Sequence, residues 1–269
     1  MTPSERKKLT LFDLAAMKRD GQVITMLTAY DASFARRVDK AGVDCVLVGD
    51  SLGNVVQGRD STLPVTVDDM VYHLEAVRRG LQTAWLIADM PFLSYHDRAS
   101  ALDSAGRLMR SGAEMVKLEG GSAVTPLVHE LVAQGIPVCG HLGLTPQHVH
   151  QLGGYRVQGR DEALARKLHE DALALEAAGA SLLVLECVPS ALAASVSQAL
   201  GIPVIGIGAG VEVDGQVLVL YDALGISSGR GPKFVKDFMP EGGTIDGALS
   251  AFVAAVRERR FPGPEHSYS

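Results

Sequence analysis

The chain has 269 residues, of which 47% are hydrophobic and 21% are charged, a composition typical of a folded globular protein rather than a disordered one. The formal net charge of −6 disfavours a nucleic-acid partner, and the only basic cluster, at residues 257–260, is short. No apolar stretch is long enough to cross a membrane, and the three cysteines form no CxxC pair. We therefore expect a cytoplasmic protein with reduced, core-packed cysteines.

The first predicted element is a helix over residues 10–20, because Thr10 and Asp13 have the spacing of a capping pair. After it, one unit recurs along the chain: a helix-like stretch ends in glycine, and a short apolar run that ends in polar residues follows. Glycine ends helices because it accepts the left-handed conformation, and the runs have the length and composition of strands. The predicted strands are residues 23–28, 44–50, 84–88, 114–119, 136–141, 181–186 and 202–208.

Helices are predicted between these strands. Thr66 and Asp69 make a second capping pair, for a helix that ends near Gly80. Residues 214–226 stay open between strand and helix, because their Val-Leu-Val-Leu-Tyr run suits a strand whereas Asp214 could cap a helix. Further helical stretches are residues 97–111 and 161–178, and an apolar stripe predicts a last helix through Ile245, Ala248, Leu249, Phe252, Val253 and Val256.

Strands that alternate with helices along the whole chain require parallel pairing with right-handed crossovers. About eight such units in about 250 residues is the content of a closed α/β barrel, the (β/α)₈ TIM barrel, and an open doubly wound sheet is the alternative. No linker interrupts the pattern, so we expect a single domain over residues 1–269, with the barrel at 23–259 and a C-terminal tail at 260–269. We expect that tail to be solvated or packed on a neighbouring subunit.

Acidic residues close four of the predicted strands: Asp50, Asp89, Glu119 and Glu186. Because the carboxyl ends of barrel strands meet at one face, these side chains should converge there. Lys117 lies two residues before Glu119 and therefore points to the same side of its strand. Carboxylates without a matching His/Cys set suit a hard cation such as Mg²⁺. Taken singly, however, Asp50 or Asp89 could cap a helix, and Glu119 could be solvated in a loop.

Other candidate residues carry weaker signals. His141 ends the fifth predicted strand and should line the site, in either a structural or a catalytic role. His148 and His150 lie in a loop-like stretch where a metal role is less expected. Residues 206–210 form a glycine-rich turn where barrels often bind phosphate, although such turns are common. Cys187 could act as a nucleophile only in an electropositive, accessible setting.

Five motifs follow one another along the chain: Leu-Thr-Ala-Tyr-Asp at 27–31, Leu-Val-Gly-Asp-Ser-Leu-Gly at 47–53, Gly-Arg-Asp-Ser-Thr-Leu-Pro-Val-Thr at 58–66, Cys-Gly-His-Leu-Gly-Leu-Thr-Pro-Gln at 139–147 and Gly-Ile-Gly-Ala-Gly at 206–210. With these motifs, the chain resembles the ketopantoate hydroxymethyltransferase family from about residue 10 to the tail at residues 265–267. The resemblance implies a barrel of the phosphoenolpyruvate/pyruvate type that assembles as a homodecamer.

The resemblance also implies an activity: transfer of a hydroxymethyl group from methylene-tetrahydrofolate to 3-methyl-2-oxobutanoate. The product would be 2-dehydropantoate, on the route to pantothenate and coenzyme A. His141 would be a further site residue without an assigned step. By the same resemblance, the Mg²⁺ ligands are Asp50, Asp89 and Glu119, the residues that contact the oxo acid are Asp50, Ser51, Asp89 and Lys117, and the proton acceptor is Glu186.

Three other functions remain open on the residues alone. A Schiff-base aldolase would use Lys117 as its nucleophile instead of as a charge partner. A magnesium-dependent 2-oxo-acid lyase of the same barrel type would share the metal site without using folate. A non-catalytic metabolite-binding barrel is disfavoured, because binding alone does not require a proton acceptor such as Glu186 opposite the metal.

Overall fold

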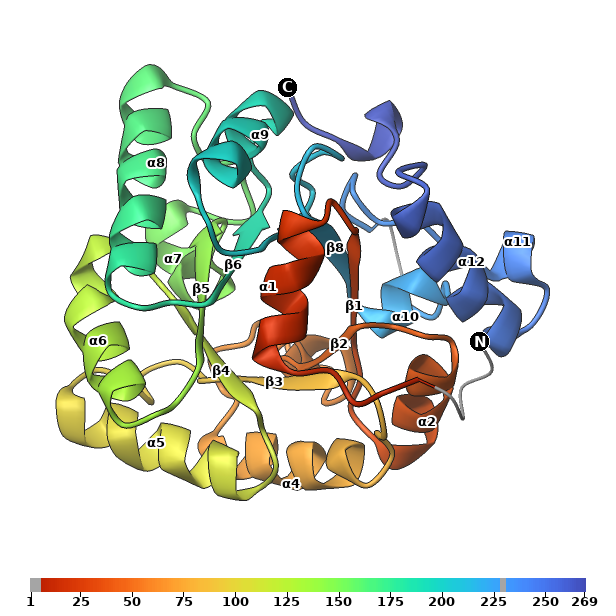
Figure 1. Cartoon of the computed structure of the whole chain (residues 1–269), viewed down its shortest axis with the longest axis horizontal. Coiled ribbons are helices and arrows are strands. Elements are labelled where there is room, and N and C mark those ends of the chain that lie inside the picture. The colour runs from red at the N-terminus through yellow and green to blue at the C-terminus, as the bar shows by residue number, and fades with distance from the viewer. Residues whose placement is uncertain (1–5, 228–230) are drawn as a thin grey trace.

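The computed structural model describes residues 6–227 and 231–269, and its centre is a closed barrel of eight parallel strands (Figure 1). Each strand pairs with the next one in the sequence, and β8 pairs back with β1, so the sheet has no open edge. The predicted (β/α)₈ barrel is therefore confirmed, and the open sheet is excluded. The strands are β1 (Ile24–Thr28), β2 (Cys45–Val48), β3 (Trp85–Asp89), β4 (Met115–Glu119), β5 (Val138–Gly143), β6 (Leu182–Glu186), β7 (Val204–Ile207) and β8 (Gly215–Leu218).

Helices surround the barrel, and the predicted capping pairs are present at two of them. Thr10 with Asp13 caps α1, and Thr66 with Asp69 caps α4. Within the described residues, every helix is too short or too polar to cross a membrane. The helices are α1 (Leu11–Arg19), α2 (Ala32–Lys40), α3 (Leu52–Val55), α4 (Val67–Arg78), α5 (Arg98–Arg110), α6 (Thr125–Ala133), α7 (Val149–Leu152), α8 (Glu162–Ala177), α9 (Ser190–Ala199), α10 (Leu220–Ala223), α11 (Met239–Gly242) and α12 (Ile245–Arg257).

The segment left open between strand and helix contains both. Its first part is β8 and its second part is α10. Asp214 does not cap a helix, because its carboxylate accepts hydrogen bonds from Lys18 Nζ at 2.6 Å and from the backbone N–H of Val204 at 2.8 Å. These bonds fix the start of β8 against β7, so a strand follows Asp214 and a helix begins only at Leu220.

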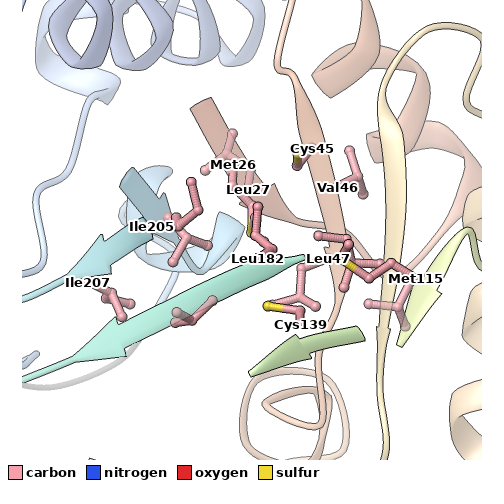
Figure 2. Close-up of a cluster of buried hydrophobic side chains, with 14 of the residues drawn as sticks. Met26, Leu27, Cys45, Val46, Leu47, Met115, Cys139, Leu182, Ile205 and Ile207 are labelled. Carbon is pink, nitrogen blue, oxygen red and sulfur yellow. The ribbon is translucent and has the colours of Figure 1, made fainter. Parts of the chain in front are cut away.

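Apolar side chains from six of the strands form a buried cluster in the barrel (Figure 2). Cys45 and Cys139 belong to it as free thiols with no exposed surface, as expected for core cysteines. Each fully buried aliphatic side chain contributes about 1.5–3 kcal/mol to stability. The labelled members are Met26 and Leu27 from β1, Cys45, Val46 and Leu47 from β2, Met115 from β4, Cys139 from β5, Leu182 from β6, and Ile205 and Ile207 from β7.

The C-terminal tail packs against its own barrel, so the expectation of a fully solvated tail is wrong, whereas its packing on a neighbouring subunit stays a prediction. The carbonyl of Tyr268 accepts hydrogen bonds from the backbone N–H and the Oγ of Ser190, both at 3.0 Å. The C-terminus consequently lies beside α9 (Figure 1). The polar composition of the tail concealed this docking, which involves the backbone carbonyls of Ser267 and Tyr268 and the Tyr268 ring.

Candidate active site

A cavity of about 620 Å³ opens where the carboxyl ends of the strands meet. Neighbouring strands bring the polar side chains into register, because Asp89 on β3 pairs with Lys117 on β4 and Glu119 on β4 pairs with His141 on β5. The sequence-predicted residues that line the cavity are Asp50, Ser51, Asp89, Lys117, Glu119, His141 and Glu186.

The carboxylates of Asp50 and Asp89 contact other residues of the cavity and not the N-terminus of a helix, so the helix-capping alternative is wrong for both. One carboxylate oxygen of Asp89 accepts a hydrogen bond from the backbone N–H of Asp50 at 3.0 Å. Its other oxygen lies 2.8 Å from Lys117 Nζ. The carboxylate of Asp50 accepts a hydrogen bond from Gln147 Nε2 at 2.8 Å. Asp50, Asp89 and Lys117 therefore form one buried cluster.

Glu119 is buried rather than solvated in a loop, with 1% of its surface exposed. Its carboxylate accepts a hydrogen bond from the backbone N–H of Gln147 at 3.0 Å and lies 3.2 Å from His141 Nδ1. His148 Nδ1 lies 3.8 Å from the same carboxylate. Burial by itself raises the pKa of Glu119, but the contacts with His141 and His148 and the charge of Lys117 outweigh it and lower the pKa to about 2.

His141 bridges two carboxylates of the cavity. Its Nδ1 lies between Glu119 and Lys117, and its Nε2 lies 3.2 Å from a carboxylate oxygen of Glu186. Burial and the nearby Lys117 lower the pKa of His141, but Glu119 and Glu186 outweigh them and raise it to about 9. His141 therefore connects the Glu119 carboxylate on β4 to the Glu186 carboxylate on β6.

Negative charge exceeds positive charge in the cavity, because its lining contains one lysine, one histidine and six carboxylates, namely Asp50, Asp60, Asp89, Glu119, Glu186 and Asp222. Burial, followed by the charges of Asp89 and Glu119, raises the pKa of Asp50 well above its usual range. Burial opposes the charge on Lys117, but the same acids outweigh it and raise the pKa of the lysine. A Schiff-base nucleophile needs a neutral amine, so this setting argues against an aldolase that uses Lys117.

The carboxylates do not by themselves enclose a metal ion. Across residues 6–227 and 231–269, no three His, Cys, Asp or Glu side chains are grouped closely enough to hold one. Mg²⁺ is commonly bound through one or two carboxylates, with water and substrate completing its coordination. Asp50 and Asp89 satisfy that lesser requirement, because both are buried carboxylates that line the cavity, and burial with the neighbouring acids destabilises the negative charge of Asp50.

Gln147 and Tyr95 hold the cluster together through hydrogen bonds, and neither was singled out from the sequence. Gln147 binds Asp50 and Glu119 as described, and its Oε1 accepts a hydrogen bond from the hydroxyl of Tyr95 at 2.6 Å. Gln147 lies in the Thr-Pro-Gln motif after β5, but a neutral amide has no charge to mark it. Tyr155 and Tyr268 also line the cavity, from loops whose position follows only from the fold.

The weaker candidates do not gain a role in this cavity. His150 is exposed and does not line it. The space beside Gly208 is filled by Phe234 and Tyr268, so the glycine-rich turn is not open for phosphate. Cys187 lines the cavity, but burial and then the charge of Glu186 raise the pKa of its thiol, the opposite of what a nucleophilic cysteine requires.

A closed (β/α)₈ barrel with charged side chains clustered at the carboxyl ends of its strands is the architecture of a TIM-barrel enzyme. Residues 8–264 match the family model of ketopantoate hydroxymethyltransferase. The 3-methyl-2-oxobutanoate hydroxymethyltransferase of Nitrosococcus oceani is 56% identical over 97% of this chain and 99% of its own length. That of Stenotrophomonas maltophilia is 56% identical over 100% and 99%. The chain belongs to the ketopantoate hydroxymethyltransferase family and is an enzyme of that class.

Solved structures with the same fold are much more distant in sequence. Phosphonopyruvate hydrolase in complex with oxalate and Mg²⁺ has a TM-score of 0.60 at 12% identity, over 81% of both chains. 2,3-Dimethylmalate lyase, a PEP mutase/isocitrate lyase superfamily member, has a TM-score of 0.58 at 21% identity, over 84% of this chain and 83% of that one. At these identities the likeness shows the fold alone, a parallel α/β barrel.

Proposed function

We propose that this enzyme transfers a hydroxymethyl group from methylene-tetrahydrofolate to 3-methyl-2-oxobutanoate, forming 2-dehydropantoate for pantothenate and coenzyme A synthesis. One observation carries the proposal: a carboxylate–lysine cluster that can bind a 2-oxo acid shares its cavity with Glu186, a carboxylate on a different strand. An oxo acid that gains a carbon at C3 must first lose its C3 proton. Such a site therefore needs a group of charged residues that binds the carboxylate and oxo group, which is the binding pole, and a separate residue that accepts the proton.

Asp50 and Asp89, with Glu119, would hold a magnesium ion. The excess of buried negative charge supports a divalent cation at this pole. When bound, Mg²⁺ supplies Lewis-acid stabilisation of negative charge on the 2-oxo oxygen. The donor set is all oxygen, which suits a hard cation.

The chain's own residues have the following proposed roles. Lys117 places a positive charge beside Asp89, where it can bind the carboxylate and the 2-oxo oxygen of the substrate. Ser51 lines the same pole, held through a 2.9 Å hydrogen bond between its Oγ and the hydroxyl of Tyr30. Glu186 accepts the proton from C3, and the resulting carbanion forms a bond to the methylene carbon of the folate. Overall, both carbon–nitrogen bonds of that methylene group break, water supplies the hydroxyl oxygen, and tetrahydrofolate leaves with the C3 proton and one proton of the water on its two nitrogens. His141, 3.2 Å from Glu186, orients that carboxylate.

Proton exchange without folate separates binding from chemistry. We expect the wild-type enzyme, with Mg²⁺ and 3-methyl-2-oxobutanoate in D₂O, to exchange the C3 proton, followed by NMR. Glu186→Gln keeps the shape and the hydrogen-bonding reach of the side chain but cannot accept a proton. Its exchange rate should fall about 10²–10⁴-fold while the oxo acid still binds.

Glu162→Gln is a matched control, because the Glu162 side chain is 91% exposed on the outer helix α8. It should exchange at the wild-type rate. Omitting Mg²⁺ should slow both exchange and folate-dependent turnover. If Glu186→Gln exchanges as fast as the wild type, Glu186 is not the proton acceptor and His141 becomes the next candidate.

A further inference from the structure

We propose that the C-terminal tail is part of the active site, and that the Tyr268 ring forms the wall against which the apolar end of the oxo acid packs. Tyr268 lines the same cavity as Glu186, Cys187, Ile207 and Phe234. Its role rests on the proposed function, because it assumes a branched 2-oxo acid whose C3 faces Glu186.

The apolar end of the substrate has a defined place in this cavity. The carboxylate and the 2-oxo group are bound at the pole formed by Asp50, Asp89 and Lys117, and Glu186 must reach C3. The carbon that gives up its proton also carries the two methyl groups, so those methyl groups lie close to Glu186. An apolar wall is therefore required beside Glu186.

Three apolar side chains surround Glu186. Ile207 is its direct neighbour on β7, and Cys187 follows it in the chain. Tyr268 lines the same cavity, with its ring against the turn at Gly208 that follows Ile207. The Glu186 side chain keeps 15% exposure, more than the 1–4% of Glu119 and Asp89. Glu186 is therefore partly exposed even with the tail docked.

The tail is anchored on both sides of the ring. Ser190, at the first turn of α9, donates two hydrogen bonds to the Tyr268 carbonyl. Lys233 Nζ donates to the carbonyl of Ser267 and lies 5.5 Å from the centre of the Tyr268 ring, a cation–π distance. These contacts hold both the tail backbone and the Tyr268 ring in place, as expected for a ring that forms a wall of the cavity.

The glycine-rich turn after β7 is shaped to receive this tail. Gly208 has a φ of +60°, and a Cβ there would lie 3.1 Å from Tyr268 Cε2 and 2.9 Å from Phe234 Cδ1. At Gly210, a Cβ would lie 2.5 Å from Oγ of Ser190, which anchors the tail. Side chains at these two positions would displace the ring or its anchor. Tail docking thus accounts for glycine at both positions.

The turn after Glu186 also depends on packing at this point. Cys187 has a φ of 49°, a left-handed conformation that is uncommon for a residue other than glycine. Such a conformation persists only where surrounding contacts hold it. Its N–H donates to the carbonyl of Ile207 at 2.9 Å, and its carbonyl accepts from Gln158 N–H at 2.9 Å. The tail packs on this turn and helps to hold Glu186 in place.

Two substitutions at Tyr268 test the wall directly. Tyr268→Phe retains the ring and should keep kcat/KM for 3-methyl-2-oxobutanoate within about twofold of wild type. Tyr268→Ala removes the ring and should lower this kcat/KM, and the folate-free proton exchange, about 10–100-fold. 3-Methyl-2-oxopentanoate has one more methylene group. Tyr268→Ala should raise the ratio of kcat/KM for this substrate to kcat/KM for 3-methyl-2-oxobutanoate by about tenfold. A merely structural residue would not change this preference.

Thiol accessibility provides a readout that does not depend on activity. Cys45 and Cys139 are fully buried, whereas Cys187 is 5% exposed and lines the cavity. Tyr268→Ala should increase the rate at which a thiol reagent modifies Cys187 about tenfold or more, as expected if the ring covers it. Tyr268→Phe should leave that rate unchanged.

Tyr72→Ala is the matched control, because Tyr72 is 73% exposed on α4. Its activity, substrate preference and thiol reactivity should equal those of the wild type. The wall is refuted if Tyr268→Ala keeps the wild-type substrate preference and thiol reactivity, or if Tyr72→Ala changes them equally. If the wild-type enzyme neither exchanges the C3 proton nor transfers the hydroxymethyl group, the proposed function fails instead, and the thiol result still reports whether Tyr268 covers the cavity.

Discussion

The two ends of the barrel differ in charge balance: acids are paired with cations at one end and outnumber them at the other. At the amino ends of the strands, acidic residues just before β2, β4 and β8 each pair with a cation from the N-terminal segment. At the carboxyl ends, four carboxylates share Lys117 and His141. The pairs at the amino end are Arg6 with Asp44, Lys8 with Glu114 at 2.7 Å, and Lys18 with Asp214 at 2.6 Å.

The difference separates stability from function. The N-terminal segment, including α1, lies across one end of the barrel and supplies the matching charges there (Figure 1). The opposite end has no such segment within the described residues, and burial raises the pKa of Asp50 there. In TIM barrels the carboxyl end generally carries the active site and the amino end carries stability. In this protein, the stabilising end has paired charges, and the end with the candidate active site has an excess of carboxylates.

The largest effect is expected at the unbalanced end. Asp89→Asn removes a carboxylate charge from the proposed metal site but retains the side-chain shape. Because Lewis-acid stabilisation is worth several kcal/mol, kcat/KM should fall at least about 10²-fold. Steady-state turnover and Mg²⁺ titration by calorimetry measure the loss. Near-wild-type turnover together with wild-type Mg²⁺ affinity would show that the metal site is elsewhere.

Magnesium should stabilise the protein through the same end. At a concentration 100 times its Kd, a ligand that binds only the folded state adds about 2.7 kcal/mol. We expect urea denaturation with Mg²⁺, compared with denaturation in EDTA, to show a gain of this size for the wild type. Asp50→Asn should gain less than half as much. An equal gain in Asp50→Asn would mean that the ion binds without Asp50.

At the balanced end, substitution should cost stability without affecting activity. The Asp44 side chain is 1% exposed and accepts hydrogen bonds from Thr25 N–H at 2.8 Å and Oγ at 2.7 Å, beside Arg6 and Arg257. Asp44→Asn should lower the free energy of unfolding by roughly 2 kcal/mol, the range for hydrogen bonds to charged groups. kcat/KM should not change. Urea denaturation and the turnover assay provide both values.

Asp68→Asn is the control for this substitution, because the Asp68 side chain is 83% exposed although it pairs with Arg107. An exposed pair contributes little, so its loss should cost less than about 0.5 kcal/mol. If Asp44→Asn lowers kcat/KM as strongly as it lowers stability, the two ends of the barrel are not functionally separate.

The smallest effect is expected at Lys8. Its pair with Glu114 is partly exposed, with 31% and 23% of the two side chains accessible, and Glu114 also accepts a hydrogen bond from Leu86 N–H. Lys8→Met should therefore lower the free energy of unfolding by about 1 kcal/mol or less. A double-mutant cycle with Glu114→Gln isolates the pair's contribution. A coupling above about 2 kcal/mol would show that the pair behaves as a buried one.

The amino-acid sequence by itself determined the strand–helix alternation, the capping pairs at Thr10 and Thr66, and the acids that close the strands. These features are local: helix caps depend on residues three apart, and strand ends on a change from apolar to polar residues. Barrel closure then brings strand ends together at one face, which is why Asp50, Asp89 and Glu119 could be grouped before the fold was known.

Only the tertiary structure decided which polar groups meet and what covers them. Gln147 reaches Asp50 across 97 residues of sequence, and the Tyr268 carbonyl meets Ser190 across 78. No local sequence pattern predicts either contact, because a neutral amide and a backbone carbonyl near the end of the chain belong to no periodic motif. The division of Gln216 and its neighbours into β8 and α10 has the same cause. Asp214 is held by Lys18, almost 200 residues away, so its capping propensity is overridden by a distant partner.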